Sequence, residues 1–431
     1  MRKAVLRALR LALLLLFCGM AQAACESLTI ACATDLHVNP AFGRYGYVNP
    51  LEPYHLQIVD AFLWDAESQG ADVLLLLGDI TNQGKLSQHE ALIAKLRNAQ
   101  NSGMAVYVLP GNHDIGEVDP ARFATLYADF GYGEALSRDP ASLSYCVLLG
   151  NQLLLMLDTG GYSGTRNAAL LTDATLQWME AQLSLAREQG WQVIAAGHYP
   201  LCTEHSTAFE GKDDALRLLR AYGVQLYLCG HLHKRCVTVQ DGLTELVVDQ
   251  TIFYPCSYAV LQADGGGGYR YQPREIAVSA WAAKHGETDA NRLGFDAYQE
   301  ALEQARCRYV VERLKGEQTL DPQSLALAED FFWKLSLCRA HGTVSRHAGM
   351  LWEHPGRQIL ITLGRGTIYE RWIPSVLRDA VPYTTGFTLK GGVIRATEEE
   401  TSAQGLPLQS PECGGHGFCP LLCLDKPARA C

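Results

Sequence analysis

The amino-acid sequence predicts an α/β fold in which two stacked sheets of mixed strand direction carry helices on their outer faces. Three observations predict this arrangement. Apolar strand-like runs alternate with amphipathic helical segments in the first half of the chain, which indicates parallel pairing. Short strands joined by turn residues continue to about residue 274, which indicates antiparallel pairing. From about residue 280 the pattern becomes helical, so we expect a first domain at 24–280 and a mainly helical region at 281–431.

The first 23 residues have the pattern of a secretory signal peptide. Four basic residues precede an apolar run from Leu11 to Phe17, and residues 21–23 form a small-residue cleavage site. The run is shorter than the roughly 20 residues that a transmembrane helix needs, and no later segment is long and apolar enough. We therefore expect an exported protein, secreted or periplasmic. An uncleaved anchor and a lipid anchor at Cys25 are the less favoured alternatives.

Charge and cysteine content narrow the expected partners. The net charge of −10 becomes −14 when the four basic residues of the signal peptide are removed, so neither nucleic acid nor an anionic membrane is expected as a bulk partner. Export makes disulfides possible among the 14 cysteines, for example between Cys307 and Cys338. Cys32 and Cys229 lie inside strands and are expected as buried thiols. Four further cysteines are expected to form disulfides, in preference to a metal site, in the tail: Cys413, Cys419, Cys423 and Cys431.

The first half contains three strand and helix pairs. In order, they are a strand ending at Cys32, a helix closing at Gly70, the strand 73–77, a helix closing at Gly103, the strand 106–109 and a helix starting at Asp119. A hairpin with strands 144–149 and 153–157 follows, with Gly150-Asn151 at its turn. The remaining elements of the expected first domain are helices 172–189 and 213–222, and strands 193–196, 224–229, 235–239, 244–248, 257–262 and 269–272.

The C-terminal region has two strong helical patterns. One carries apolar residues on one face from Phe295 to Leu314, and the second begins at the cap Asp321-Pro322 and reaches Cys338. A further helix is expected within 358–380. The tail, rich in Pro, Gly and Cys, is expected to be irregular.

Five of the predicted strands end in Asp, Asn or His. The carboxyl ends of strands in an open α/β sheet are where ligands usually bind. Carboxylate and amide oxygens mixed with imidazoles suit Zn, Mn or Fe, whereas Ca²⁺ prefers oxygen alone. The side chains at these strand ends are too many to bind one tetrahedral ion, so two ions that share a bridging carboxylate are expected. The side chains are Asp35, His37, Asp79, Asn112, His113, Asp114, His198, His231 and His233.

The charges of such a site favour a small anion. Two divalent ions, the carboxylates of Asp35 and Asp79, and one hydroxide sum to a net charge of about +1. A positive pocket in an acidic protein selects an anion, and a phosphoryl group that spans two ions about 3.5–4 Å apart is the usual one. The expected partner is therefore a small-molecule phosphoester.

The sequence blocks that contain these residues resemble the signature of a known family. The blocks resemble the five-block signature of the calcineurin-like metallophosphoesterase superfamily, in order and over roughly residues 29–239. They are Asp35-x-His37, Gly78-Asp79, Gly111-Asn112-His113-Asp114, Gly197-His198 and Gly230-His231-x-His233. The resemblance implies a four-layer α/β/β/α sandwich.

The resemblance also implies a role for each residue. His113 would stand beside the phosphate as a general acid or charge stabiliser, and Asp114 is suited to orienting its ring. The implied chemistry is in-line attack on phosphorus by a hydroxide that bridges the two metals. The implied ligands are Asp35, His37 and His233 for one ion, Asn112, His198 and His231 for the other, and Asp79 as the bridge.

Departures from subfamily patterns narrow the substrate. The second block runs Gly78 to Asn82 and lacks the acidic and Arg residues of Ser/Thr protein phosphatases. Purple acid phosphatases have a Tyr ligand in that block and Gly in place of His37, and this chain has neither feature. Secreted 5′-nucleotidases continue differently after Asp114. The chain is most similar to the cyclic-nucleotide, glycerophosphodiester and sphingomyelinase-like phosphodiesterase groups, so a diester is the favoured substrate.

Two alternatives remain open from the sequence. One is a phosphomonoesterase or nucleotidase of the same superfamily, and the other is a non-catalytic binding protein that keeps the metals as structural cross-links. The loop residues Tyr162, Tyr199 and His205 are expected to border the pocket. Five histidines that match no block are expected at the surface or in helix packing: His55, His89, His341, His347 and His354.

Overall fold

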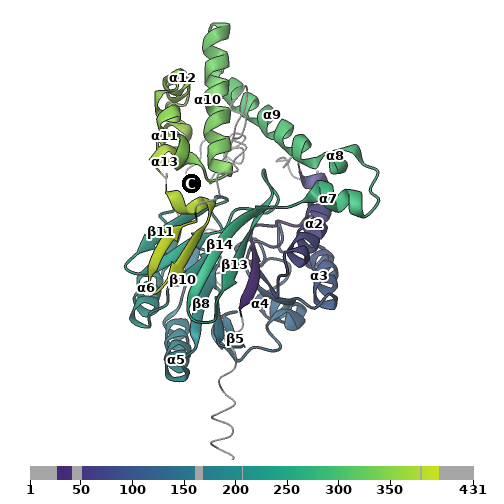
Figure 1. Ribbon diagram of the computed structural model, residues 1–431, viewed down its shortest axis with the longest axis vertical. Coiled ribbons are helices and arrows are strands. Elements are labelled where there is room, and N and C mark those ends of the chain that lie inside the picture. Colours follow the sequence, from purple (N-terminus) through teal and green to yellow (C-terminus); the bar gives the residue numbers. More distant parts are fainter. Residues whose placement is uncertain (1–26, 41–50, 161–167, 206, 379–380, 398–431) are drawn as a thin grey trace, which may run out of the picture.

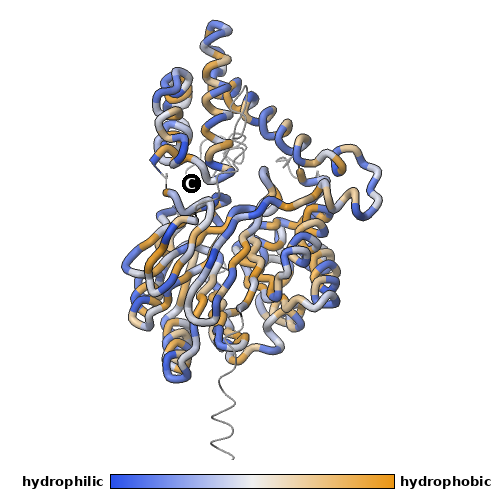
Figure 2. The backbone as a smooth tube through the Cα atoms, in the orientation of Figure 1, coloured by the Kyte–Doolittle hydropathy of each residue, from blue (hydrophilic) through white to orange (hydrophobic). Residues whose placement is uncertain are grey.

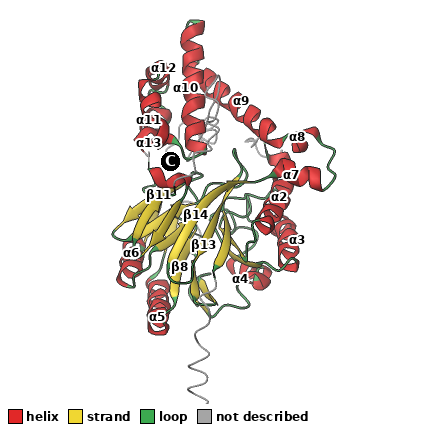
Figure 3. Ribbon diagram, viewed as in Figure 1, coloured by secondary structure: helices red, strands yellow, loops and turns green. Residues whose placement is uncertain are grey.

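The computed structural model describes residues 27–40, 51–160, 168–205, 207–378 and 381–397. The expected signal peptide, Cys25, Tyr162 and the four tail cysteines lie outside these ranges. Two seven-stranded sheets form the body of the molecule, as Figures 1 and 3 show. No helix in the described ranges is long and apolar enough to cross a lipid bilayer.

The first sheet has parallel strands at one edge and antiparallel strands at the other. Strands β1, β2 and β3 run parallel because helical crossovers connect them, whereas β13 to β16 pair antiparallel. The strand order is β16 (Val393–Ala396), β15 (Phe387–Lys390), β14 (Gly268–Glu275), β13 (Ser257–Ala263), β1 (Leu28–Ala33), β2 (Val73–Leu77) and β3 (Ala105–Leu109).

The second sheet is also mixed. Its four central strands are parallel, and antiparallel strands lie at both edges. The order is β11 (Cys236–Gln240), β12 (Leu243–Val247), β10 (Leu226–Cys229), β8 (Gln192–Gly197), β6 (Gln152–Leu157), β5 (Tyr145–Leu149) and β4 (Ser137–Arg138). A separate pair is formed by β7 (Ala168–Leu170) and β9 (Ala208–Glu210).

Side-chain alternation along β6 shows how the layers stack. Leu154 and Met156 join the core that the first sheet contributes to, whereas Leu153, Leu155 and Leu157 pack with the helices behind the second sheet. The result confirms the four-layer α/β/β/α sandwich (Figure 1). The helices on the first side are α2 (His55–Ser68), α3 (Leu86–Asn101) and α4 (Pro120–Leu126), and those on the second are α5 (Asp173–Gln189) and α6 (Lys212–Ala221).

The helical region stands at one end of the sandwich (Figure 1) and has an apolar core of its own. Figure 2 shows hydrophobic residues, in orange, interspersed with hydrophilic ones along its helices. Large side chains of this core include Phe331, Phe332, Leu351, Leu360 and Tyr369. Its helices are α7 (Val278–Lys284), α8 (Ala290–Leu293), α9 (Phe295–Lys315), α10 (Pro322–Ala340), α11 (Val344–Glu353), α12 (Pro355–Leu363) and α13 (Tyr369–Arg378).

Two features of this region differ from the sequence-based expectation. The helix expected within 358–380 is two helices, because a turn with Gly366 at φ 74° separates α12 from α13. The chain then returns to the first sheet, where β15 pairs with β14 and turns at Gly391-Gly392 into β16. Phe387 and Leu389 point inward and are fully buried, so two alternating apolar residues are enough to hold this short strand.

The cysteines form no disulfide within the described residues. Cys32 and Cys229 are buried thiols, as expected. The suggested bond between Cys307 and Cys338 is wrong. Each sulfur contacts a hydroxyl instead, Cys307 that of Ser336 and Cys338 that of Thr343, and burial raises the pKa of both thiols.

Candidate metal centre

The carboxyl ends of five parallel strands converge at one end of the sandwich. β1, β2 and β3 deliver the residues from Asp35 to Asp114, and β8 and β10 deliver the three histidines of the second sheet. Backbone hydrogen bonds join the loops within each sheet: Asp35 N donates to Gly78 O (3.0 Å), and Gly230 N donates to His198 O (3.0 Å). Residues that are scattered over about two hundred positions therefore share one cluster.

Three groups of ligand atoms lie in this cluster, each within 4.8 Å: Asp35, His37 and His233; Asp79, His198 and His231; and His37, Asp79 and His113. In the first, His233 Nε2 is 3.2 Å from both Asp35 Oδ1 and His37 Nε2. In the second, Asp79 Oδ2 is 3.3 Å from His198 Nε2. The same oxygen is 3.9 Å from His37 Nε2, so Asp79 reaches both groups.

The backbone of these residues is strained. Only seven non-glycine residues in the described ranges have positive φ, and five of them are expected ligands. Left-handed backbone is unfavourable for Asp and His, and it persists only where surrounding contacts fix it, typically at functional sites. The five, with φ between 41° and 69°, are Asp35, His37, Asp79, His231 and His233.

Glycines in the signature blocks make room for the ligands. A Cβ on Gly111 would lie 2.2 Å from Asp79 Oδ1, and one on Gly230 would lie 1.9 Å from Thr34 Oγ1 and 2.7 Å from Asp35 Oδ2. Any larger residue would displace a carboxylate of the cluster.

Unsatisfied polar atoms indicate what the cluster can hold. Asp35 Oδ1, Asn112 Oδ1 and His198 Nε2 are buried and make no well-aligned hydrogen bond to the described residues, although Asp35 Oδ1 lies 3.2 Å from His233 Nε2 and His198 Nε2 lies 3.3 Å from Asp79 Oδ2. Buried polar atoms are rarely left in this state unless a ligand or water satisfies them. Carboxylate, amide and imidazole donors fit Mn, Fe or Zn, so the residues fit a pair of such cations.

Electrostatics keep the carboxylates ionised. Burial raises the pKa of Asp35, but the His233 ring outweighs burial and lowers it to about 2. Burial is likewise outweighed at Asp79, where the His198 and His113 rings hold the pKa well below its usual value. Burial and the His113 ring lower the pKa of His37 to about 3. The cluster therefore contains two buried carboxylates in the form that binds cations.

His113 lies beside the cluster with its ring partly exposed. Its Nε2 is 4.0 Å from Asp79 Oδ2, and its Nδ1 is 2.7 Å from the Asn82 carbonyl. A carbonyl can only accept, so Nδ1 carries the proton of this bond and Nε2 faces the cluster. The backbone N–H of His113 donates to Asp79 Oδ1 (2.7 Å), which fixes this loop to the shared carboxylate.

Asp114 does not orient the His113 ring, and that part of the expectation is wrong. Its Oδ1 accepts from Thr81 N (2.7 Å) and Thr81 Oγ1 (2.8 Å), and its Oδ2 accepts from Gly111 N (2.8 Å) and Ile80 N (3.2 Å). These bonds use the whole carboxylate to join the loops after β2 and β3. Burial and the Asp79 charge raise its pKa to about 6 despite the bonds.

Two histidines outside the signature blocks, His55 and His89, support loops of the cluster. His55 and His89 are buried in helices, which fits the helix-packing expectation, but they also hold loops of the cluster. His89 Nε2 is 3.1 Å from the Asp114 carbonyl, and its Nδ1 is 2.9 Å from Tyr127 Oη. His55 makes a hydrogen bond to the backbone of His37. No sequence signal identifies these roles, because both lie in ordinary amphipathic helices.

Residues from the second sheet flank His231. The Tyr199 ring lies 4.0 Å from the His231 ring, and His205 packs on Tyr199 with ring centroids 6.0 Å apart. Thr207 Oγ1 is 3.3 Å from His231 Nε2, a contact that the motifs did not indicate. Tyr199 and His205 therefore border the cluster as expected.

Comparisons with known proteins agree with this geometry. Residues 28–235 match the family model described as calcineurin-like phosphoesterase. The chain is 31% identical over 144 residues to tartrate-resistant acid phosphatase type 5 from Homo sapiens, covering 30% of this chain and 42% of that protein. It is 28% identical over 223 residues to the Sus scrofa protein of the same name, covering 45% and 63%. The chain thus spans less than two thirds of these relatives.

Solved structures with low sequence identity are also similar. A dimetal phosphatase from Danio rerio has 14% identity and a TM-score of 0.47, covering 58% of this chain and 96% of that chain. A purple acid phosphatase from yellow lupin has 16% identity and a TM-score of 0.42, covering 58% and 52%.

Proposed function

This chain carries a calcineurin-like phosphoesterase domain over residues 28–235, and on that premise we propose that it is a dinuclear-metal phosphohydrolase. The supporting observation is the position of the Asp79 carboxylate. Its Oδ2 lies 3.3 Å from His198 Nε2 and 3.9 Å from His37 Nε2, and so the carboxylate joins two groups of ligand atoms. Two cations around one shared carboxylate is the arrangement used to bind and cleave phosphoesters.

The proposed ligand sets follow the two groups. Two bound Mn, Fe or Zn ions would polarise the phosphoryl oxygens and supply a water of lowered pKa as nucleophile. Asp79 is shared. Asp35, His37 and His233 hold one ion, and Asn112, His198 and His231 hold the other.

His113 is the proposed proton donor. Because the Asn82 carbonyl holds the Nδ1 proton, Nε2 donates to the leaving oxygen or to a phosphoryl oxygen only when the ring is the imidazolium, and loss of that second proton leaves the neutral Nδ1–H ring. Asp114 is proposed as a positioning residue, since its carboxylate fixes the loops that carry Asp79 and His113.

A diester is the favoured substrate. The purple acid phosphatase pattern has Gly at position 37 and Tyr in the second block, whereas here the His37 ring lies 3.2 Å from His233 and Asn82 supports His113 through its backbone. A monoester is the second candidate, because the curated relatives are named acid phosphatases. Export through the N-terminal segment would make an extracellular small-molecule phosphoester the substrate in either case.

Hydrolysis of matched chromogenic substrates tests this proposal. Purified protein loaded with Mn, Zn or Fe is assayed with bis(p-nitrophenyl) phosphate and p-nitrophenyl phosphate, and Asp79→Ala serves as the control. We expect turnover of both, faster for the diester, and loss of both in Asp79→Ala. Faster monoester turnover would support the second candidate. Binding of two cations without turnover of either substrate would favour the non-catalytic, metal-stabilised binding protein.

A further inference from the structure

The C-terminal end of α10 lies against the loop that carries His233. Arg339 Nη2 donates to the backbone carbonyl of His233, with an N···O distance of 3.5 Å. Two residues later, His341 Nδ1 is 2.7 Å from Glu275 Oε1 and its Nε2 is 3.1 Å from Tyr254 Oη. The helical region therefore contacts the sandwich at the metal centre.

The His233 ring has a second contact, with the aromatic ring of Phe253. The ring of Phe253, next to Tyr254, lies 6.1 Å from the His233 ring. The end of α10 thus touches the backbone of His233 directly, and through Tyr254 it holds the segment whose aromatic ring packs on the His233 imidazole.

His233 differs from the other strained ligands in the source of its support. His37 N donates to Asp79 O (2.9 Å), and His231 N donates to Asp35 Oδ2 (3.0 Å), so these bonds arise within the sandwich. His233 has φ 48°, and within the described residues its backbone accepts its hydrogen bond from Arg339, 106 positions later. A strained backbone needs outside contacts to hold it. The His233 ring is held within the sandwich by Asp35 at 3.2 Å, and the contact to the His233 carbonyl comes from the helical region.

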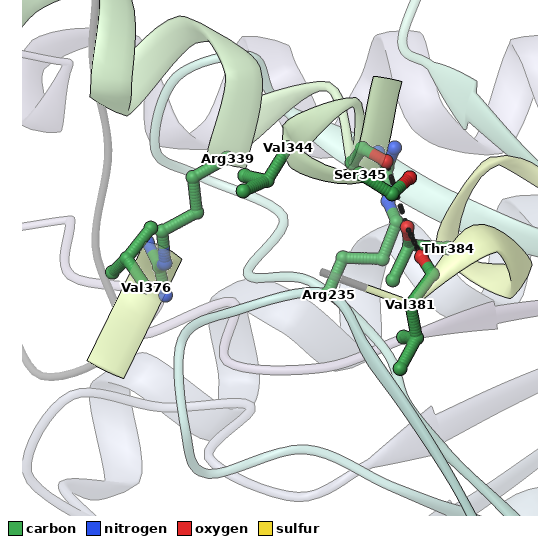
Figure 4. Close-up of a pocket in the computed structure, with 8 residues that line it drawn as sticks. Arg235, Arg339, Val344, Ser345, Val376, Val381 and Thr384 are labelled. Carbon is green, nitrogen blue, oxygen red and sulfur yellow. Dashed lines mark hydrogen bonds between the residues drawn. The ribbon is translucent and has the colours of Figure 1, made fainter. Parts of the chain in front are cut away.

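The space beside Arg339 does not suit a substrate. Figure 4 shows Arg235 and Arg339 lining a cavity of about 20 Å³ between the sandwich and the helices. That volume admits about one water molecule. The remaining lining residues are Gly342, Val344, Ser345, Val376, Val381 and Thr384. The cavity beside Arg339 is therefore too small for a phosphoester, and the Arg339 side chain contacts the His233 carbonyl instead.

We propose that Arg339 is a positioning residue for the metal centre, which fixes His233 as a ligand and makes the helical region a working part of the site. This inference rests on the proposed two-cation centre. Groups that orient metal ligands typically contribute roughly 10–100-fold to metal affinity. Removal of Arg339 should therefore weaken the cation held by Asp35, His37 and His233, and leave the one held by Asn112, His198 and His231.

Cation titration of the full chain tests the proposal. Manganese binding is measured by calorimetry on the unaltered protein and on Arg339→Ala, Arg339→Lys and Arg346→Ala, with the circular dichroism of each. Arg346 is the matched control, an exposed arginine of the next helix whose Nη2 lies 3.4 Å from Thr385 Oγ1. The spin-coupled signal of a manganese pair gives a second readout.

The outcomes separate this inference from the proposed function. We expect two cations in the unaltered protein and in Arg346→Ala, one of them bound roughly 10–100-fold more weakly in Arg339→Ala, and partial recovery in Arg339→Lys. Loss of the paired manganese signal with unchanged dichroism would support positioning. Two unchanged affinities in a folded Arg339→Ala protein would overturn this inference alone. An unaltered protein that binds no cation would overturn both, and equal weakening of both cations would reduce Arg339 to a general structural contact.

Discussion

Single side chains in this protein take on backbone conformations that their type disfavours. Asp35, His37, Asp79, His231 and His233 all have positive φ, at a cost of order 1–3 kcal/mol for each residue. The strain aims their side chains into one cluster, where buried carboxylates and imidazoles meet. Such a cluster is unfavourable for folding alone, and the proposed pair of cations would compensate for it.

Removal of the His113 ring tests its assignment as proton donor. His113→Ala should lower kcat roughly 10²–10⁴-fold, because general acid catalysis contributes about that factor. Its metal content should not change, since the ring belongs to neither of the two proposed ligand sets. His347→Ala is the control, because that ring is bonded to the Thr343 carbonyl in the helical region. Unchanged kcat in His113→Ala would contradict the assignment of His113 as the proton donor.

A methyl group added at Gly230 tests the packing of the cluster. In Gly230→Ala the new Cβ would meet Thr34 Oγ1 and Asp35 Oδ2, so we expect weaker metal binding and a loss of roughly 1–3 kcal/mol in stability. Gly349→Ala is the control, because its Cβ would meet no atom within 4 Å. Metal titration and chemical denaturation measure the two effects. Equal behaviour of the two variants would contradict this account of the glycine.

At the scale of elements, a buried carboxylate holds the loop that follows His198. Glu245 in β12 is fully buried, and its oxygens accept from the backbone N–H groups of Leu201 (2.5 Å), Cys202 (2.7 Å) and Thr203 (2.7 Å). Backbone donors of a loop are thereby satisfied by one side chain of the second sheet. The first of these donors, Leu201, lies three residues after the proposed ligand His198, so the position of the loop bears on the site.

Substitution of Glu245 tests this support. Glu245→Gln should cost about 2–3 kcal/mol in the free energy of unfolding, because its amide cannot accept at both positions and the charge-assisted bonds are lost. The exposed Glu204 on the same loop gives the matched control, Glu204→Gln, which should change stability little. Urea unfolding measures both. A cost for Glu204→Gln as large as that for Glu245→Gln would contradict the assignment.

Elements were predictable where their patterns are local. The strands that end at Leu77 and Leu109 were correct because continuous apolar runs meet Gly78 and Pro110, and the strand expected to end at Cys32 ends one residue later, at Ala33. The β15–β16 hairpin was missed because it is short and is stabilised by pairing with β14, more than 100 residues earlier.

The site was predictable from motif spacing, but not its support. Six of the seven proposed ligands lie in the groups of ligand atoms, and the seventh, Asn112, has a buried side-chain oxygen without a hydrogen-bond partner among the described residues. The partner of His113 was assigned to Asp114 because the two are adjacent in sequence, whereas the structure uses the Asn82 carbonyl, a contact with no side-chain signature. The roles of His89 and Arg339 likewise depend on tertiary contacts.

For the whole molecule, metal binding should be coupled to folding stability. Ligands from both sheets meet only in the folded chain, so cations bind the native state in preference to the unfolded one. At a free cation concentration about 1,000 times Kd the expected stabilisation is about 4 kcal/mol. Thermal unfolding with manganese and with a chelator measures it. The same Tm in both conditions would contradict this coupling.

The helical region and the sandwich form one structure in this account. The chain leaves the first sheet at Glu275, builds α7 to α13 and returns to the same sheet at Phe387. Removal of the helices would therefore also remove strands from the sheet, and it would separate Arg339 from His233.

Anomalous diffraction from crystals grown with manganese is the most direct test of the central claim. The account predicts two manganese peaks, one on each side of the Asp79 carboxylate, with His233 at one and His198 at the other. A single peak, or peaks away from Asp79, would contradict it.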